Sequence, residues 1–385
     1  MIYLDNAATS WPKPEAVYQS MDSFMRQVGA SPGRSAHRLS IEAGRTVYET
    51  RESLAQLFGG DDPKRIVFSH NATAALNLVI RGILHPGDHV VTSSMEHNSM
   101  MRPLRAMEKK GVEITVVNCS AEGFLDPQDM ERAIKPNTKL ITLNHASNVV
   151  GTIQPLAEVG QIARRHEIPF LVDAAQTAGC YPIDVKVMNI DLLVFSGHKG
   201  LYGPQGVGGL YLGKGMEHQV EPLTYGGTGS HSEYEYQPDF LPDKYESGTP
   251  NTVGLAGLGA GVRFVLYQEV NVIQRKEETL TQSLLHGLRA ITGVTLYGNS
   301  NAQKQVAVIS FNIFGLTSSE VAAQLEEGYQ IMCRAGLHCS PATHRTIGTF
   351  PQGTVRLSPG YFTSQKDIEI TLEAVQNIAA GKRRC

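Results

Sequence analysis

The segment PFLVDAAQTAGCYPIDVKVMNIDLLVFSGHKG, residues 169–200, contains two short apolar runs that each end in polar residues. PFLVDA (169–174) and DLLVFS (191–196) are mostly apolar and lack strict alternation, which is typical of strands that helices cover on both faces. The stretch between Asp173 and Lys199 is long enough for one crossover helix. We therefore expect two neighbouring parallel strands here, joined by a helix.

Similar runs recur on both sides of this segment. They are RIVFS (65–69), HVVTSS (89–94), EITVV (113–117), KLITLN (139–144) and GGLYL (208–212). The stretches between them have helical spacing or composition at residues 72–84, 98–110, 126–134 and 156–166. The sequence therefore predicts an α/β fold with a mostly parallel seven-stranded sheet and flanking helices, and ligands bind such sheets at the carboxyl ends of the strands.

The pattern changes after residue 255. One long helix is expected at 253–292, a strand at 304–315, and helices at 318–328 and 364–380. We interpret residues 15–255 as a large cofactor-binding domain. Residues 1–14 and 256–385 are then a smaller α+β lobe.

Composition narrows the class of protein. Of the 385 residues, 41% are hydrophobic and 18% are charged, and the 34 basic and 37 acidic residues are well mixed and give a net charge of -3. No long basic run favours nucleic acid, and no apolar run reaches the roughly 18 residues that a membrane span needs. The N-terminus has no basic segment followed by an apolar one, so we expect a cytoplasmic protein.

The cysteines and histidines do not form a recognisable metal or disulfide pattern. There is no CxxC pair and no HExxH motif, which gives no support for a metal site. An odd number of cysteines scattered over a long chain favours reduced thiols, at Cys119, Cys180, Cys333, Cys339 and Cys385.

Lys199 and Asp173 are the first candidates for chemistry. Lys199 lies just beyond a buried strand, where loss of water lowers the pKa of an amine and makes it nucleophilic enough to form an imine with an aldehyde cofactor. Asp173 ends the neighbouring strand, where a carboxylate can pair with a protonated pyridine nitrogen. The alternatives are a surface lysine and an aspartate that caps a helix or forms an ion pair.

Polar residues follow other strand ends as well. Ala72 and Thr73 begin a helix after the first strand, where backbone amides and a hydroxyl can hold a phosphate. A simple helix cap is the alternative. His97 and Asn148 are placed to stack on a ring or to form a hydrogen bond with it, although single residues of these types are usually ordinary polar groups.

Eight segments spread nearly from end to end of the chain form a recognisable set. They are YLDNAATSWPKP (3–14), HNATAALN (70–77), EHNS (96–99), HASNVVGT (145–152), VDAAQ (172–176), SGHKGLYGPQGVGGLY (196–211), ESGTPN (246–251) and RAGLHCSP (334–341). With these segments the chain resembles the cysteine desulfurase and selenocysteine lyase family of class-V aminotransferases, which are fold type I pyridoxal-phosphate enzymes.

The resemblance implies a role for each matching residue. Lys199 is the Schiff-base lysine, His97 stacks on the pyridine ring of pyridoxal 5'-phosphate, and Asp173 contacts the ring nitrogen. Gln176 and Asn148 lie near the phenolic oxygen. The phosphate is held by Thr73, Ser196 and His198, together with Thr249 from the second subunit of a homodimer.

The same resemblance assigns the substrate side of the site. Cys339 falls on the reactive cysteine, whose thiolate His338 or Arg334 could favour, whereas a buried structural thiol is the alternative. Arg356 matches the arginine that binds the substrate carboxylate, a two-point fit for a guanidinium, with a surface ion pair as the alternative. Asn6, Ala7, Ala8 and His37 fall where the family lines its substrate pocket.

The expected reaction is that of a cysteine desulfurase, which converts cysteine to alanine and leaves its sulfur as a persulfide on Cys339. Selenocysteine lyase activity and a class-V aminotransferase or lyase without sulfur chemistry are the alternatives. A cofactor-bearing adaptor without activity is less favoured, because Lys199, Asp173, Cys339 and Arg356 are all present. In the family branch with a short, ordered cysteine loop, two histidines usually precede the cysteine, and a small residue and then Met-Pro follow it. This chain has Leu337-His338-Cys339-Ser340-Pro341 instead. These changes leave the substrate and a sulfur- or selenium-acceptor protein open.

Overall fold

The computed structural model describes residues 1–33 and 35–381, so Cys385 lies outside the described residues. Its main feature is a seven-stranded sheet with the order β2-β8-β7-β6-β5-β3-β4, in which only β8 pairs antiparallel, with β7 and with β2. The predicted α/β class and the mostly parallel seven-stranded sheet are confirmed. The strands are β2 (Ile66–Ser69), β3 (His89–Ser93), β4 (Glu113–Val117), β5 (Thr138–Asn144), β6 (Phe170–Asp173), β7 (Leu192–Ser196) and β8 (Gly208–Leu212).

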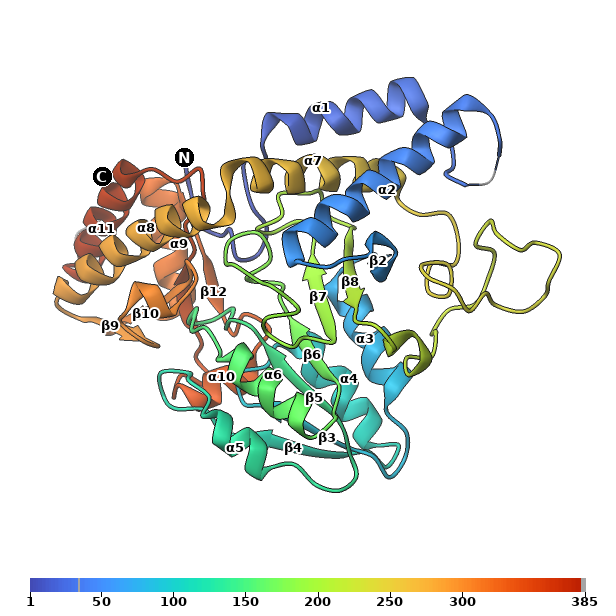
Figure 1. Ribbon diagram of the computed structural model, residues 1–385. Helices are drawn as coiled ribbons and strands as arrows, with labels where there is room; N and C mark the ends of the chain where they lie inside the picture. Colours follow the sequence, from blue (N-terminus) through green and yellow to red (C-terminus); the bar gives the residue numbers. More distant parts are fainter. Residues whose placement is uncertain (34, 382–385) are drawn as a thin grey trace.

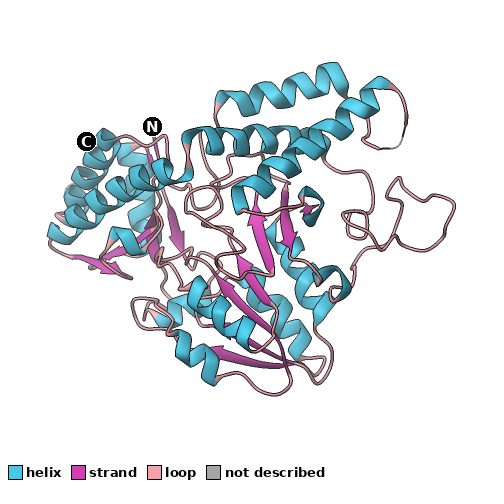
Figure 2. Cartoon of the chain, in the orientation of Figure 1, coloured by secondary structure: helices cyan, strands magenta, loops and turns pink. Residues whose placement is uncertain are grey.

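Helices cover both faces of this sheet (Figures 1 and 2). In β7, Leu193 and Phe195 pack into one buried cluster, while Leu192 and Val194 pack into the cluster on the opposite face. Both faces of the strand are therefore apolar, which explains the uninterrupted apolar runs of the sequence. The helices are α1 (Glu15–Ser23), α2 (Arg38–Phe58), α3 (Ala72–Ile83), α4 (Asn98–Glu108), α5 (Pro127–Arg132), α6 (Leu156–Arg165) and α7 (Thr252–Gln268), with short helical turns at Phe24–Val28, Pro63–Arg65 and Met216–His218.

The connection between β6 and β7 corrects one prediction. These strands are parallel neighbours, as expected, but residues 174–191 form turns instead of the expected crossover helix. Gly179 has a φ of 92°, and a Cβ added there would lie 2.2 Å from the Gly200 carbonyl oxygen. The positive φ at Gly179 is incompatible with a continuous right-handed helix, and the crossover packs closely against the loop after β7 at Gly200.

The smaller lobe is built on a four-stranded antiparallel sheet with the order β12-β13-β10-β9. Its elements are α8 (Val270–Ala290), β9 (Val294–Tyr297), a turn at Ala302–Lys304, β10 (Ile309–Ile313), α9 (Ser318–Tyr329), β11 (Ile331–Met332), β12 (Arg334–Gly336), α10 (Pro341–Thr346), β13 (Thr354–Leu357) and α11 (Gln365–Ala379). The single long helix expected at 253–292 is wrong. Glu269 has a φ of 64°, outside the helical region, and separates α7 from α8.

The N-terminal strand β1 (Ile2–Tyr3) lies in the smaller lobe, where it pairs in parallel with β11. Helix α7 contacts α1 and α2, and its Leu255, Leu258 and Val262 belong to the core of the large sheet. The proposed division into residues 15–255 and residues 1–14 with 256–385 stays a prediction. Among the described residues, no helix is both long and apolar enough to cross a membrane.

Candidate active site

A cavity lies at the carboxyl ends of the central strands, where the strand-end residues of the sequence meet. Its empty volume, open solvent included, is about 600 Å³. The lining includes every residue predicted to bind the cofactor except Thr249. The lining residues are Asn71, Ala72, Thr73, His97, Ser99, Asn144, Ala146, Asn148, Asp173, Ala175, Gln176, Ser196, His198 and Lys199.

Asp173 is the last residue of β6 and Lys199 lies in the loop after β7, and both line the cavity. Burial lowers the pKa of Lys199 to about 8, and Asp173 partly opposes this shift. Burial raises the pKa of Asp173, whose Oδ1 accepts a 2.9 Å hydrogen bond from the Ala175 amide. The amine therefore loses its proton near pH 8, so a substantial fraction is uncharged close to physiological pH, with a buried carboxyl group beside it.

The loop that carries Lys199 is held by the N-terminal segment. The carbonyl oxygen of His198 accepts hydrogen bonds from Thr9 Oγ1 at 3.1 Å and from Lys13 Nζ at 2.8 Å. Ser10 Oγ donates to the carbonyl oxygen of Lys199 at 2.8 Å. The N-terminal segment, almost two hundred positions away in the sequence, therefore fixes the backbone of the loop that carries Lys199.

His97 lies at the N-terminus of α4 and enters the cavity as a neutral ring. Its Nδ1 accepts a 3.0 Å hydrogen bond from the Ser99 amide, which leaves the proton on Nε2. Burial lowers the pKa of His97 to about 4, and the nearby cations Lys199 and Arg334 contribute. A neutral, buried imidazole can stack on an aromatic ring without adding charge.

The side of the cavity near α3 offers groups suited to a phosphate. Asn71, not Thr73, caps α3, because the Asn71 side chain accepts from the Ala74 amide at 2.9 Å. Thr73 Oγ1 instead contacts Ser99 Oγ at 2.7 Å. Nδ1 of His198 is buried and has no hydrogen-bond partner among the described residues. Sequence reasoning missed Asn71 and Ser99, although both lie in quoted motifs.

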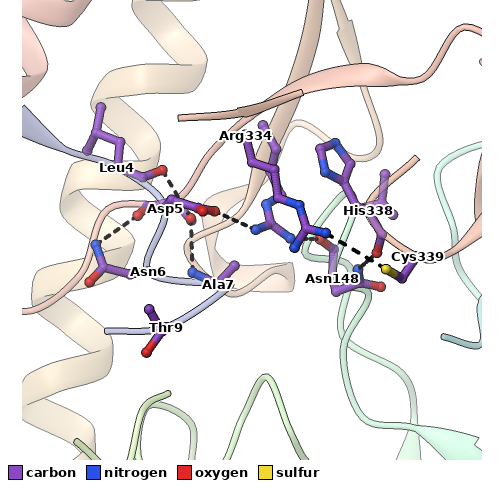
Figure 3. A network of polar contacts seen from close by, with 12 residues as sticks. Leu4, Asp5, Asn6, Ala7, Thr9, Asn148, Arg334, His338 and Cys339 are labelled. Atoms are coloured by element: carbon purple, nitrogen blue, oxygen red, sulfur yellow. Dashed lines mark hydrogen bonds and ion pairs between the residues drawn. The ribbon is translucent and has the colours of Figure 1, made fainter. Parts of the chain in front are cut away.

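Cys339 lies on the short loop between β12 and α10, and its residue is exposed. Its sulfur lies 3.8 Å from Arg334 Nη2, so a guanidinium faces the thiol (Figure 3). His338 is different: Nε2 contacts the Thr354 carbonyl oxygen at 3.1 Å, and burial lowers the pKa of His338 to about 2. Of the two residues considered as thiolate partners, the structure brings Arg334, not the uncharged His338, to the sulfur.

Arg356 lies in β13 and is 1% exposed, so the alternative of a surface ion pair is wrong. Its Nη2 pairs with Asp5 Oδ1 at 2.7 Å, and its Nη1 donates to the carbonyl oxygen of Asn148 at 2.9 Å. Nε has no hydrogen-bond partner among the described residues. Asp5 is a further residue that sequence reasoning missed, although it lies in the quoted segment YLDNAATSWPKP.

The remaining predicted substrate residues divide into two groups. Asn6 and Ala7 line a smaller neighbouring cavity that shares Gln176 and Lys199 with the first one. Ala8 is not among the lining residues of either cavity. His37 is exposed and caps α2, and Thr249 is also exposed, so within one chain the structure does not bring these two residues to the site.

The arrangement agrees with a comparison against protein families. The model for class-V aminotransferases matches residues 2–371. This chain belongs to the class-V aminotransferase family.

Within this family, the chain is similar to several proteins named as cysteine desulfurases. A probable cysteine desulfurase of Methanothermobacter thermautotrophicus is 35% identical over 98% of this chain and 94% of its own length. A probable cysteine desulfurase of Pyrococcus abyssi is 35% identical over 100% of this chain and 95% of its own length. The structure of a cysteine desulfurase from Thermococcus onnurineus superposes with a TM-score of 0.93, at 36% identity, over 99% of this chain and 95% of that one.

Proposed function

We propose that this chain is a pyridoxal-phosphate-dependent cysteine desulfurase that converts cysteine to alanine and keeps the sulfur as a persulfide on Cys339. One observation carries the proposal. The exposed Cys339 sulfur lies beside Arg334 on a loop anchored to Asn148, and Asn148 lines the cavity that also holds Lys199 and Asp173. A nucleophilic thiol and a site suited to amino-acid chemistry therefore share one wall.

The residues of the cavity fit pyridoxal 5'-phosphate. Asp173 would hold the ring nitrogen, His97 would stack on the ring, and Gln176 and Asn148 would lie near the phenolic oxygen. The phosphate would be held by the unpartnered His198 Nδ1, together with Ala72, Thr73 and Ser196. When bound through Lys199, the cofactor supplies an electron sink for the substrate's α-carbon.

The chain's own groups would then perform the transfer. The substrate's amine would first free Lys199 from its bond to the cofactor, and the Lys199 amine, whose pKa is lowered to about 8, would then take the α-proton from the substrate, with His97 as the less favoured base. The Cys339 thiolate attacks the substrate sulfur, so that a sulfur–sulfur bond forms while the carbon–sulfur bond breaks. The electron pair of the broken bond stays with the carbon, which takes up a proton and leaves as part of alanine.

Arg356 would bind the substrate carboxylate, since its buried guanidinium donates a hydrogen bond to the carbonyl oxygen of Asn148, a residue of the cavity wall. Its ion-pair partner Asp5 binds Nη2, while Nε has no hydrogen-bond partner among the described residues. Asn6 would line the substrate end of the site. Ala8 and His37 stay predictions as substrate contacts.

The proposal includes a cytoplasmic homodimer. Thr249 is exposed and lies outside the cavity of its own chain, so its contact with the phosphate requires a second copy. A protein that accepts the sulfur completes the cycle by removing it from Cys339. A molar mass of one chain in light scattering of the cofactor-loaded protein would contradict the dimer.

A turnover assay with cysteine, cysteine sulfinate and selenocysteine, scored for alanine, tests the function. We expect alanine and sulfide from cysteine in the presence of reductant, and loss of both with Cys339→Ala. A strong preference for selenocysteine would make the chain a selenocysteine lyase. A keto acid in place of alanine, or full activity of Cys339→Ala, would exclude the proposed sulfur chemistry.

A further inference from the structure

The side-chain amide of Asn148 joins the cavity wall to the loop of Cys339. Asn148 Nδ2 donates to the carbonyl oxygen of His338 at 2.7 Å, and Ser340 Oγ donates to Asn148 Oδ1 at 2.6 Å. Asn148 is 7% exposed and Ser340 is fully buried. Both ends of one amide are therefore used on the two residues that flank the nucleophile.

The orientation of this amide follows from chemistry. A carbonyl oxygen can only accept, so the amide nitrogen of Asn148 must face His338. The amide oxygen then faces Ser340, whose hydroxyl must be the donor. Nδ2 carries two hydrogens and the His338 carbonyl oxygen accepts one, which leaves a second N–H on a residue that lines the cavity.

The backbone at the nucleophile needs such support. His338 and Cys339 have φ angles of 48° and 59°, a region that residues other than glycine rarely adopt and that persists only where surrounding contacts hold it. The Asn98 amide donates to the carbonyl oxygen of Cys339 at 2.9 Å, which adds a tether from the start of α4. The residues before and after Cys339 are both tied to Asn148.

We propose that Asn148 and Ser340 are positioning residues that couple the Cys339 loop to the cofactor-binding wall, a role that rests on the proposed function. The Ser340 hydroxyl holds the amide of Asn148, and that amide sets both the backbone of Cys339 and the direction of the remaining N–H. A substitution at Ser340 should therefore alter the backbone position of Cys339, although Ser340 does not contact the substrate.

Hydrogen exchange of the cofactor-free protein tests the clamp. The amide of Ser340 donates to the carbonyl oxygen of Leu337 at 2.8 Å, so exchange in residues 337–341 reports whether the loop is closed. We expect Ser340→Ala to speed exchange there by about tenfold, the ratio that corresponds to one lost buried hydrogen bond. Asn148→Asp, which keeps the acceptor but cannot donate to His338, should have the same effect, and it decides the question if Ser340→Ala does not fold.

Thr343→Val is the matched control. Thr343 is also fully buried, in the helix that follows the loop, and its hydroxyl donates to the carbonyl oxygen of Met95 at 3.1 Å. Valine removes this hydroxyl at nearly constant volume, so exchange in 337–341 should stay at the wild-type rate. Unchanged exchange in Ser340→Ala, or an equal increase in Thr343→Val, would overturn the clamp.

Steady-state kinetics of the cofactor-loaded protein separate positioning from general loosening. We expect Ser340→Ala to lower kcat for alanine release severalfold and to leave KM for cysteine unchanged, because the substrate carboxylate is bound elsewhere. A rise in KM with kcat unchanged would overturn the positioning role. If the wild-type protein released no alanine from cysteine, the proposed function would fail, but the exchange result would still decide the clamp.

Discussion

Replacing Asp5 by asparagine removes the charge that accompanies the buried guanidinium of Arg356. The two side chains meet at 2.7 Å, and they are 23% and 1% exposed, respectively. Asparagine keeps an oxygen that can accept from Nη2, so the hydrogen bond survives while the negative charge is lost. Arg356 then remains buried without a counter-ion.

The size of the effect follows from the burial of the two partners. Losing one partner of a fully buried pair costs about 3–5 kcal/mol, whereas an exposed pair contributes about 0–1 kcal/mol. Asp5 is partly exposed and asparagine keeps the acceptor, so we expect Asp5→Asn to lower the free energy of unfolding by about 2 kcal/mol. Substrate or product should reverse part of this loss, because its carboxylate replaces the missing charge at Arg356.

Urea denaturation at low salt measures both effects without screening the charges. The matched control is Asp22→Asn, since Asp22 pairs with Arg26 at the same 2.7 Å but with side chains 58% and 75% exposed. The control should change the free energy of unfolding by less than about 0.5 kcal/mol. Added alanine should stabilise the cofactor-loaded Asp5→Asn protein more than the wild type, through tighter binding to the native state.

Two results would refute this reasoning. Equal stability of Asp5→Asn and the wild type would mean that Asp5 does not neutralise Arg356 in solution. A loss of stability with no extra response to alanine would mean that the substrate carboxylate does not bind at Arg356.

Three further predictions concern other ionisable groups. Arg334→Gln should slow alkylation of Cys339 by iodoacetamide at neutral pH by roughly threefold, because the guanidinium 3.8 Å from the sulfur attracts the negative charge of the reacting sulfur; an unchanged rate would mean that Arg334 does not act on Cys339. Covalent attachment of pyridoxal phosphate, followed by absorbance, should speed up as pH rises and be half-maximal near pH 8, where half of the Lys199 amine is neutral; a rate that does not change with pH would contradict the lowered pKa. Burial raises the pKa of Glu96 to about 8, so folding keeps this carboxyl protonated and stability falls as pH rises from about 4.5 to 8. Glu96→Gln should remove that decline and stabilise the protein at pH 8 by a few kcal/mol relative to the wild type, and parallel stability curves would show the idea to be wrong.

The sheet and its strand-end residues could be predicted because both depend on local patterns. Apolar runs predicted all seven strands, and the rule that ligands bind at the carboxyl ends of such strands directed attention to Asp173 and Lys199. The crossover before Lys199 could not be predicted in the same way. Its lack of a helix depends on the close approach of Gly179 to Gly200, which is a tertiary contact.

Contacts between residues that are distant in the sequence could not be predicted either. Nothing near Arg356 in the sequence indicates Asp5 as its partner. The two residues meet only because the N-terminal segment folds into the smaller lobe, where β1 pairs with β11. His338 is next to Cys339 in the sequence, which suggested an electrostatic role. The turn buries its ring against Thr354 instead, and this direction could not be inferred from spacing.

The central claim is that Cys339 receives the sulfur. The cofactor-loaded protein should be mixed with cysteine for a single turnover, without reductant or acceptor, and its peptides analysed by mass spectrometry. The account predicts one additional sulfur atom on the peptide that contains Cys339, formed in step with alanine and absent from Cys339→Ser. Additional sulfur on Cys119, Cys180 or Cys333 instead, or alanine formed without any additional sulfur on the protein, would contradict it.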